Sequence, residues 1–95
     1  MRDYELVTIL RPDITDENLP AVTDRIGQWV SGQGGEVTKF DVWGRRRMAY
    51  PIREFREGNY VISQLRLEPR ATTELERSLK LSEDVLRYLL VRAGE

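Results

Sequence analysis

Residues 36–67 read EVTKFDVWGRRRMAYPIREFREGNYVISQLRL. This stretch is dense in β-branched, aromatic and apolar residues, and Glu57-Gly58-Asn59 within it has the composition of a turn. The pattern predicts one strand over residues 36–42 and another over residues 60–67. Two strands that follow each other directly favour an antiparallel hairpin, so the chain has a β-β centre with further segments on either side.

The first of these strands has a long continuation. Trp43-Gly44 interrupts the strand pattern, and the chain then runs through three arginines to Ile52. If residues 36–52 were all extended, they would span roughly 55 Å at about 3.3 Å per residue, which exceeds the width of a small sheet. We therefore expect this segment to bend at Gly44 or to project as a hairpin arm. Pro51 has no N–H to donate, which predicts that the strand lies at a sheet edge.

On the N-terminal side, residues 4–10 form a strand-type run that Arg11-Pro12-Asp13 ends. A helix is predicted next, starting near Asp16 with Thr15 or Asp16 as its N-cap and stopping in the glycine-rich segment 32–35. Its apolar face would consist of residues at helical spacing, namely Leu19, Val22, Ile26, Trp29 and Val30.

On the C-terminal side, Pro69 is predicted to open a short helix, and residues 85–91 are predicted to form a last strand. The i, i+4 spacing gives this helix an inward pair, Leu75 with Leu79, and a solvent-facing pair, Glu76 with Lys80.

The resulting order is β-α-β-β-α-β, with no linker, repeat or low-complexity stretch. This order predicts an α+β fold of the ferredoxin-like split β-α-β type, with a four-stranded antiparallel sheet and two helices on one face. Right-handed crossovers then place the second and fourth strands at the sheet edges. Because the chain has room for only one core, we expect a single domain over residues 1–95.

Both faces of the first and last strands are substantially apolar. In the first strand, residues 6, 8 and 10 (Leu, Thr, Leu) alternate with Val7 and Ile9, and in the last strand, residues 86, 88 and 90 (Leu, Tyr, Leu) alternate with Arg87, Leu89 and Val91. Two short helices can cover only one face of the sheet. The open face is therefore predicted either to receive a protein or RNA partner or to be shielded by long neighbouring side chains. The sequence leaves both interpretations open.

The composition excludes several classes of site. The chain has no cysteine and no histidine, which removes disulfides, thiol nucleophiles, and the commonest general base and metal ligand. We therefore expect no enzymatic activity, no metal, no cofactor and no small-molecule substrate. The charged start and the lack of an apolar run of roughly 20 residues indicate a cytoplasmic protein without a membrane segment.

Charge is unevenly distributed although the net charge is only −1. Residues 1–43 hold 4 Lys/Arg and 8 Asp/Glu, a net of −4, whereas residues 44–95 hold 11 and 8, a net of +3. Residues 44–56 contain five arginines against Glu54 alone. Guanidinium groups bind phosphate oxygens and stack on bases, so this segment is the strongest candidate for a nucleic-acid contact. On an extended chain, Arg45 and Arg47 would share one face and Arg46 the other. The alternative interpretation is a solvated charge run on a protruding hairpin.

Four segments resemble the bacterial family of small ribosomal subunit protein six, in the family's order and spacing. They are MRDYEL (1–6), GGEV (34–37), WGRRRMAYPI (43–52) and LSEDVLRY (81–88). Two positions differ from the usual pattern: Met48 replaces a leucine, a change that conserves volume, and Asp3 stands where family members often carry a base.

This resemblance implies a structural constituent of the small subunit that binds its rRNA in the central domain, or platform, together with small-subunit protein eighteen. Carried over by position, the implied RNA-binding residues are Arg2, Tyr4, Arg46, Arg47, Tyr50, Arg53, Arg87 and Arg92. For the surface that contacts the partner protein, we expect Trp43, Ile62, Gln64 and Leu89. At a helical junction the expected mechanism is recognition of shape through phosphates and 2′-hydroxyls.

Three other hypotheses compete. An RNA-recognition motif would need paired aromatic residues in the strand over 60–67, which that segment lacks. An acyl-phosphate hydrolase would need a glycine-rich loop after the first strand, whereas Arg11-Pro12-Asp13 has no glycine. A purely protein-binding or regulatory domain would leave the arginine run without a role.

Overall fold

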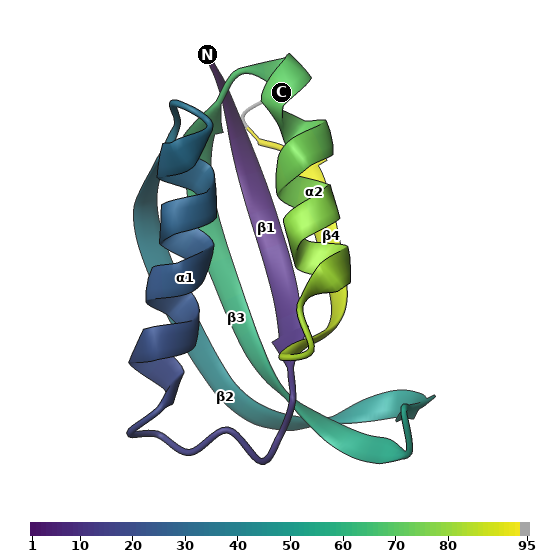
Figure 1. Ribbon diagram of the computed structural model, residues 1–95. Coiled ribbons are helices and arrows are strands. Elements are labelled where there is room, and N and C mark those ends of the chain that lie inside the picture. Colours follow the sequence, from purple (N-terminus) through teal and green to yellow (C-terminus); the bar gives the residue numbers. More distant parts are fainter. Residues whose placement is uncertain (94–95) are drawn as a thin grey trace.

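The computed structural model describes residues 1–93 and arranges them as one antiparallel sheet with two helices against a single face (Figure 1). Its elements in chain order are β1 (Arg2–Leu10), α1 (Leu19–Gly32), β2 (Glu36–Ile52), β3 (Phe55–Leu67), the short 3-10 helix η1 (Pro69–Ala71), α2 (Thr72–Leu81) and β4 (Val85–Arg92). The strands lie in the order β2-β3-β1-β4. This confirms the ferredoxin-like α+β fold with the second and fourth strands at the edges. The last two residues of the predicted domain lie outside the described residues.

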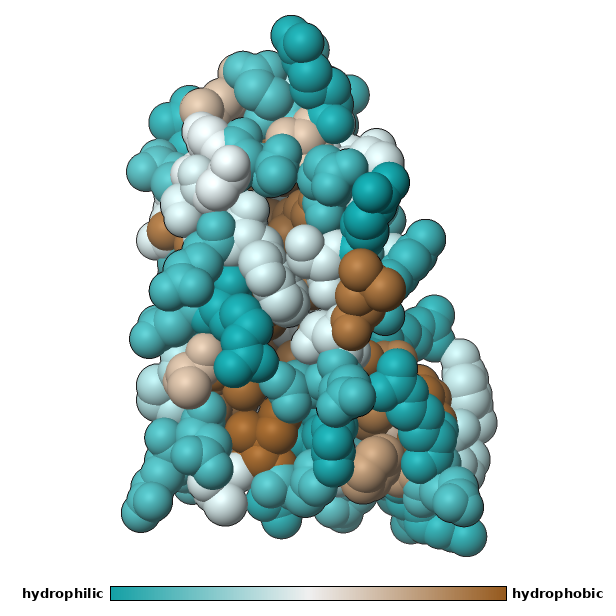
Figure 2. All heavy atoms as spheres, viewed as in Figure 1, coloured by the Kyte–Doolittle hydropathy of each residue, from teal (hydrophilic) through white to brown (hydrophobic). Residues whose placement is uncertain are grey.

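The core lies between the helices and the inner face of the sheet. Leu6 and Leu10 of β1 and Val61 and Leu65 of β3 are buried there, together with Ile26 of α1 and both leucines of the α2 pair. Thr8 is also fully buried, and its hydroxyl donates a hydrogen bond of 3.2 Å to the carbonyl oxygen of Val61. On the helix-covered side of the molecule, hydrophilic side chains occupy most of the visible surface (Figure 2). The predicted helix face of α1 is confirmed, with Trp29 only partly buried.

Helix α1 begins later than expected. It starts at Leu19 rather than near Asp16, and Asn18 occupies the N-cap position without a side-chain hydrogen bond. The hydroxyl of Thr15 instead accepts a hydrogen bond of 3.3 Å from the backbone N–H of Asn18. The prediction of Thr15 or Asp16 as the N-cap is therefore wrong, because Thr15 organises a turn that precedes the helix. Pro20 lies in the first turn of the helix, where its missing N–H costs no hydrogen bond.

The predicted turn at Glu57-Gly58-Asn59 is also wrong. These residues belong to β3, and the chain reverses at Arg53-Glu54, between the paired residues Ile52 and Phe55. Gly58 serves a close approach: a methyl group on it would lie 2.3 Å from Cγ2 of Ile9. Arg53 and Glu54 both have positive φ, at 50° and 69°. A two-residue hairpin turn needs such angles, which an Asn-Gly pair usually provides. Arg-Glu is not a typical pair for this turn, so its composition does not predict it.

The β2–β3 hairpin extends beyond the rest of the sheet. Strand β1 ends at Leu10, which pairs with Asn59, so residues 46–58 continue as a two-stranded ribbon that we call the arm (Figure 1, lower right). The register of β2 shifts between Val42 and Gly44, and Gly44 has a φ of 85°. Both predicted features, the bend at Gly44 and the projecting hairpin arm, are therefore present.

The arm is attached to the body of the domain at its base and near its tip. Met48 is buried at 7% exposure beside Gly58. The Tyr50 hydroxyl accepts a hydrogen bond of 2.6 Å from Nη1 of Arg87 in β4, and Nη1 of Arg53 donates one of 3.3 Å to the carbonyl oxygen of Glu83. These contacts give the projecting ribbon a defined position against the start of β4.

Two glycine substitutions are expected to have opposite effects on stability. Gly58→Ala introduces a methyl group 2.3 Å from Ile9 and 3.3 Å from the Leu10 carbonyl oxygen, and should destabilise the fold by about 1–3 kcal/mol. Gly27→Ala, in the interior of α1 with nothing within 4 Å, should stabilise it by about 0.5–1 kcal/mol. Chemical denaturation of both variants measures the two changes. Equal stabilities would contradict the close approach of the arm to β1.

Loss of the Tyr50 hydroxyl should loosen the arm selectively. Tyr50→Phe removes the acceptor for Arg87, at a cost in global stability of about 1 kcal/mol or less because the contact is exposed. Hydrogen exchange should become faster at arm amides and stay unchanged along the β1–β3 ladder. Tyr60→Phe is the matched control, since it removes a hydroxyl outside the arm. Unchanged exchange in the arm of Tyr50→Phe would show that this hydrogen bond does not hold the ribbon.

Candidate nucleic-acid interface

The cations of this protein fall into two groups according to their partners. Within residues 1–93, ion pairs with carboxylates join Arg11 with Asp13 at 2.8 Å, Arg25 with Asp84 at 2.9 Å, Arg66 with Asp3 at 3.4 Å and Arg77 with Glu74 at 3.7 Å. By contrast, none of the five arginines in residues 44–56 forms an ion pair with a carboxylate of residues 1–93. The positive charge of the hairpin is therefore available to an external anion.

The run of three arginines presents its charges on both faces of the ribbon. Arg45 pairs with Asn59, Arg46 with Gly58 and Arg47 with Glu57 in an uninterrupted register, so successive side chains alternate. The guanidinium carbon of Arg46 lies 4.7 Å from the centre of the Trp43 ring. This cation–π contact orients Arg46 without neutralising it. The predicted alternation of Arg45 and Arg47 against Arg46 is thus confirmed.

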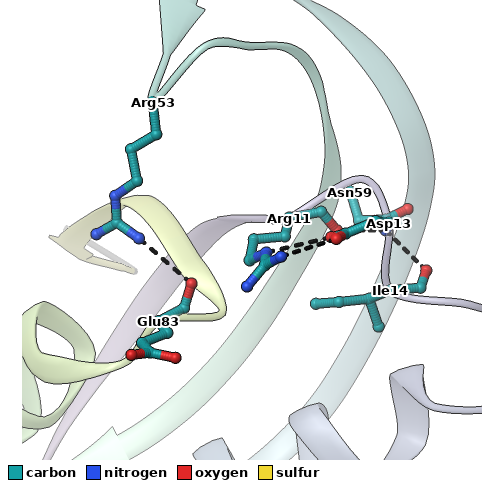
Figure 3. Close-up of polar contacts among 6 residues, drawn as sticks. All are labelled: Arg11, Asp13, Ile14, Arg53, Asn59 and Glu83. Atoms are coloured by element: carbon teal, nitrogen blue, oxygen red, sulfur yellow. Dashed lines mark hydrogen bonds and ion pairs between the residues drawn. The ribbon is translucent and has the colours of Figure 1, made fainter.

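Arg53 and Arg87 are held by neutral oxygen atoms. Arg53 donates to the backbone carbonyl of Glu83, and the carboxylate of Glu83 points away from the guanidinium (Figure 3). Arg87 donates to the Tyr50 hydroxyl. Both guanidinium groups are therefore positioned while they keep their full charge. Tyr50, predicted as an RNA contact, is 56% exposed and also orients one of these cations.

The loop between β1 and α1 contacts the β2–β3 hairpin both at Asn59, where the arm begins, and at Phe55, next to the turn. Arg11 donates from Nε and Nη2 to the two carboxylate oxygens of Asp13, at 3.2 and 2.8 Å, and its guanidinium carbon lies 5.6 Å from the centre of the Phe55 ring. The hydrogen bond and the charge of Asp13 raise the pKa of Arg11. The amide of Asn59 donates to the carbonyl oxygens of Arg11 and Ile14, at 3.1 and 3.4 Å (Figure 3). The cation of Arg11 is therefore used for structure.

The remaining predicted RNA-binding residues lie at the other end of the sheet. Arg2 opens β1, and Arg92 in β4 pairs with Tyr4. Arg2 and Arg92 are exposed, whereas Tyr4 is only 9% exposed and packs in the core. The structure thus separates the predicted set into an arm end, which gathers Arg46, Arg47, Tyr50, Arg53 and Arg87, and a terminal end with Arg2, Tyr4 and Arg92. Direct contact of Tyr4 with RNA stays a prediction, and its visible role is packing.

The four residues predicted to contact a partner protein share the open face of the sheet. Trp43, Ile62 and Gln64 line a hollow of about 360 Å³ with Val7, and Leu89 lines a second hollow of about 190 Å³ that also contacts Val7. Leu89 is 55% exposed and Trp43 49% exposed. Neighbouring side chains therefore shield the open face incompletely.

Lys80 is a cation that the sequence pattern did not single out. Its spacing from Glu76 suggested a solvent-facing pair on α2, but no ion pair joins them among residues 1–93. Glu76 lies instead beside Tyr88, where burial, followed by the charge and hydrogen bond of Glu76, raises the pKa of Tyr88. Lys80 lines the same depression as Arg53 and Arg87. Only the three-dimensional packing of the arm against α2 and β4 reveals this neighbourhood.

Within residues 1–93, no cluster of three or more acidic side chains is placed to hold a metal ion. No helix in this part of the chain is long and apolar enough to cross a bilayer.

Comparison with known proteins supports a single family. The profile described as "Ribosomal protein S6" matches residues 3–92. The small ribosomal subunit protein bS6 of Moorella thermoacetica is 47% identical over 95 residues, covering 100% of this chain and 97% of that protein. The protein of the same name from Desulforamulus reducens is 41% identical, with 100% of both chains covered.

The solved structures agree. The crystal structure of 30S ribosomal protein S6 from Thermotoga maritima superimposes with a TM-score of 0.87 at 26% identity, covering 96% of this chain and 86% of that chain. The C-terminal domain of the MgtC protein from Mycobacterium tuberculosis shares the fold alone, at 16% identity and a TM-score of 0.64. The chain therefore belongs to the ribosomal protein S6 family, whose members are structural proteins of the small subunit of the cytoplasmic bacterial ribosome and not enzymes.

Proposed function

We propose that this protein binds folded rRNA in the central domain of the small subunit, jointly with small-subunit ribosomal protein eighteen. The observation that carries the proposal is the contrast between cations that are ion-paired and the arginines of residues 44–56, which are not. Leaving several guanidinium groups without carboxylate partners on one ribbon costs electrostatic energy in the free protein. An RNA backbone supplies the missing negative charge.

The proposed mechanism is recognition of RNA shape by the arm. Arg46 and Arg47 point to opposite faces of a ribbon that is two strands wide, so they can contact phosphates of two RNA strands at once. Guanidinium groups bind phosphate oxygens through paired N–H donors. Arg53 and Arg87 add two cations that are already held in position, which reduces the entropy lost on binding. Contacts of this kind position the RNA without reading its base sequence.

The terminal end of the sheet is proposed as a second, weaker contact. Arg2 and Arg92 are exposed on neighbouring strands, where both can reach one RNA backbone. The acidic neighbour Asp3 pairs with Arg66 and so leaves Arg2 without that competing charge. Tyr4 supports this end by packing its ring beneath the strands.

The open face of the sheet is proposed as the surface for the partner protein. Ile62 and Trp43 line one hollow and Leu89 another, and Val7 lines both. Burying this apolar area against a partner would contribute favourable free energy at roughly 25 cal/mol per Å². A protein with a net charge of −1 makes few phosphate contacts, so joint binding compensates for a weak affinity alone.

Removal of three arm arginines should abolish most RNA affinity. We expect the triple variant Arg46→Ala, Arg47→Ala and Arg53→Ala to bind a central-domain rRNA fragment at least about tenfold more weakly than the wild type. The slope of log K against log salt concentration should fall by roughly three, because each arginine neutralises about one phosphate. Filter binding over a salt series measures both quantities.

A matched control separates position from net charge. The triple variant Arg25→Ala, Arg70→Ala and Arg77→Ala removes the same charge from the helix layer and should keep nearly the wild-type affinity and slope. Equal losses of RNA affinity in the two triple variants would show that only net charge matters and would refute the role assigned to the arm.

A charge on the open face should disrupt the protein partnership while leaving the fold intact. Ile62→Glu places a carboxylate in the hollow beside Trp43, so the gain in RNA affinity that protein eighteen provides should fall by about tenfold or more. Val42→Glu, at a residue 50% exposed on the opposite face of the sheet, is the control. Undiminished cooperativity in Ile62→Glu would place the partner elsewhere.

A further inference from the structure

Three cations from separate elements surround one depression in the surface. Arg53 comes from the tip of the arm, Lys80 from the last turn of α2 and Arg87 from β4. The depression has a volume of about 400 Å³, which is ample for a phosphate group. Its other lining residues carry no charge, namely Leu79, Val85, Leu86 and Tyr88. Arg53 and Lys80 are 27 residues apart in the sequence, so the sequence alone does not show that they are neighbours. They come together because the arm packs against the body of the domain.

None of the three charges is neutralised by the described part of the chain. Arg53, Lys80 and Arg87 form no ion pair with a carboxylate of residues 1–93. Acidic residues of the neighbouring elements are engaged elsewhere or point away: Asp84 pairs with Arg25, and the Glu83 carboxylate is directed away from Arg53 (Figure 3). Glu76 lies beside Tyr88, which lines the depression, and forms no ion pair with Lys80 among residues 1–93. The carbonyl groups at the C-terminus of α2 carry a partial negative charge of about half a unit, which three full cations outweigh.

The two guanidinium groups also keep donors available. In its hydrogen bond to a neutral oxygen, each uses only Nη1. The other nitrogens of each group remain able to donate to an anion. Since Tyr50 and the Glu83 carbonyl fix the positions of these groups, an entering anion meets a site that is already formed.

We propose that this depression is a phosphate-binding site that receives one backbone phosphate of the bound RNA, with Lys80 as a direct contact. The proposal rests on the RNA-binding function proposed above and adds a residue and a defined position to it. A tetrahedral anion accepts hydrogen bonds from several directions, and the three cations, which come from three different elements, can donate from different sides. A phosphate held here also ties the arm tip to α2 and β4, so RNA binding and the seating of the arm stabilise each other.

The test uses the only two lysines of the chain as a matched pair. Lys80→Gln should weaken binding of the central-domain rRNA fragment about three- to tenfold and lower the salt slope by about one. Lys39→Gln, which removes the same charge from the open face, should leave both values unchanged in the absence of a partner protein. In the wild type, the bound RNA should also protect Lys80 from an amine-acylating reagent, and inorganic phosphate at the same ionic strength should not.

The outcomes separate this site from the function on which it rests. Wild-type affinity of Lys80→Gln, combined with full reactivity of Lys80 in the complex, overturns the phosphate site even if the arm triple variant loses binding. Protection of Lys80 by inorganic phosphate alone would assign the depression to free anions and overturn its role in the RNA complex. If the arm triple variant also binds as well as the wild type, the RNA-binding function itself fails.

Discussion

The paired strands β2 and β3 extend beyond the end of the neighbouring strand β1, and this difference in strand length creates the arm. Once β1 has ended opposite Asn59, the ribbon has no third strand to support it. An isolated two-stranded hairpin is only marginally stable in water. The ribbon is ordered here because Gly58 allows it to approach Ile9, while Met48 is buried beside that contact. The absence of one side chain therefore helps to determine where Arg46, Arg47, Arg53 and Arg56 lie.

The distribution of partners explains how a nearly neutral domain can present a strongly basic surface. Arg11, Arg25, Arg66 and Arg77 are compensated by carboxylates close to them, and all four lie outside the arm. Arg46 and Arg53 of the arm contact an indole ring and a backbone carbonyl instead, and Arg87 of β4 contacts the phenol of Tyr50. Such neutral contacts fix direction without cancelling charge. A net charge computed over the whole chain averages the two populations and conceals the second.

Much of the architecture follows from residue patterns, because strand alternation and helical spacing are local. The order of elements, the edge position of β2 and the apolar face of α1 were all predictable in this way. The turn was misplaced because Gly58 is consistent with either a turn or a close approach, and only the position of Ile9 distinguishes them. The actual turn, Arg53-Glu54, lacks any glycine that would mark it. Lys80 was missed for a similar reason, since its spacing from Glu76 suggests a pair on the helix surface, whereas Glu76 lies beside Tyr88.

The turn at the tip has a consequence for which substitutions the protein can tolerate there. Two side-chain-bearing residues in left-handed backbone conformation cost of order 1–3 kcal/mol each, a cost that glycine would avoid. A search that selects only for heat resistance would therefore replace Arg53 and Glu54 and would discard a guanidinium with them. Under the proposed function, thermal stability and anion binding therefore make opposing demands on residue 53, where glycine would relieve the backbone and arginine supplies the cation.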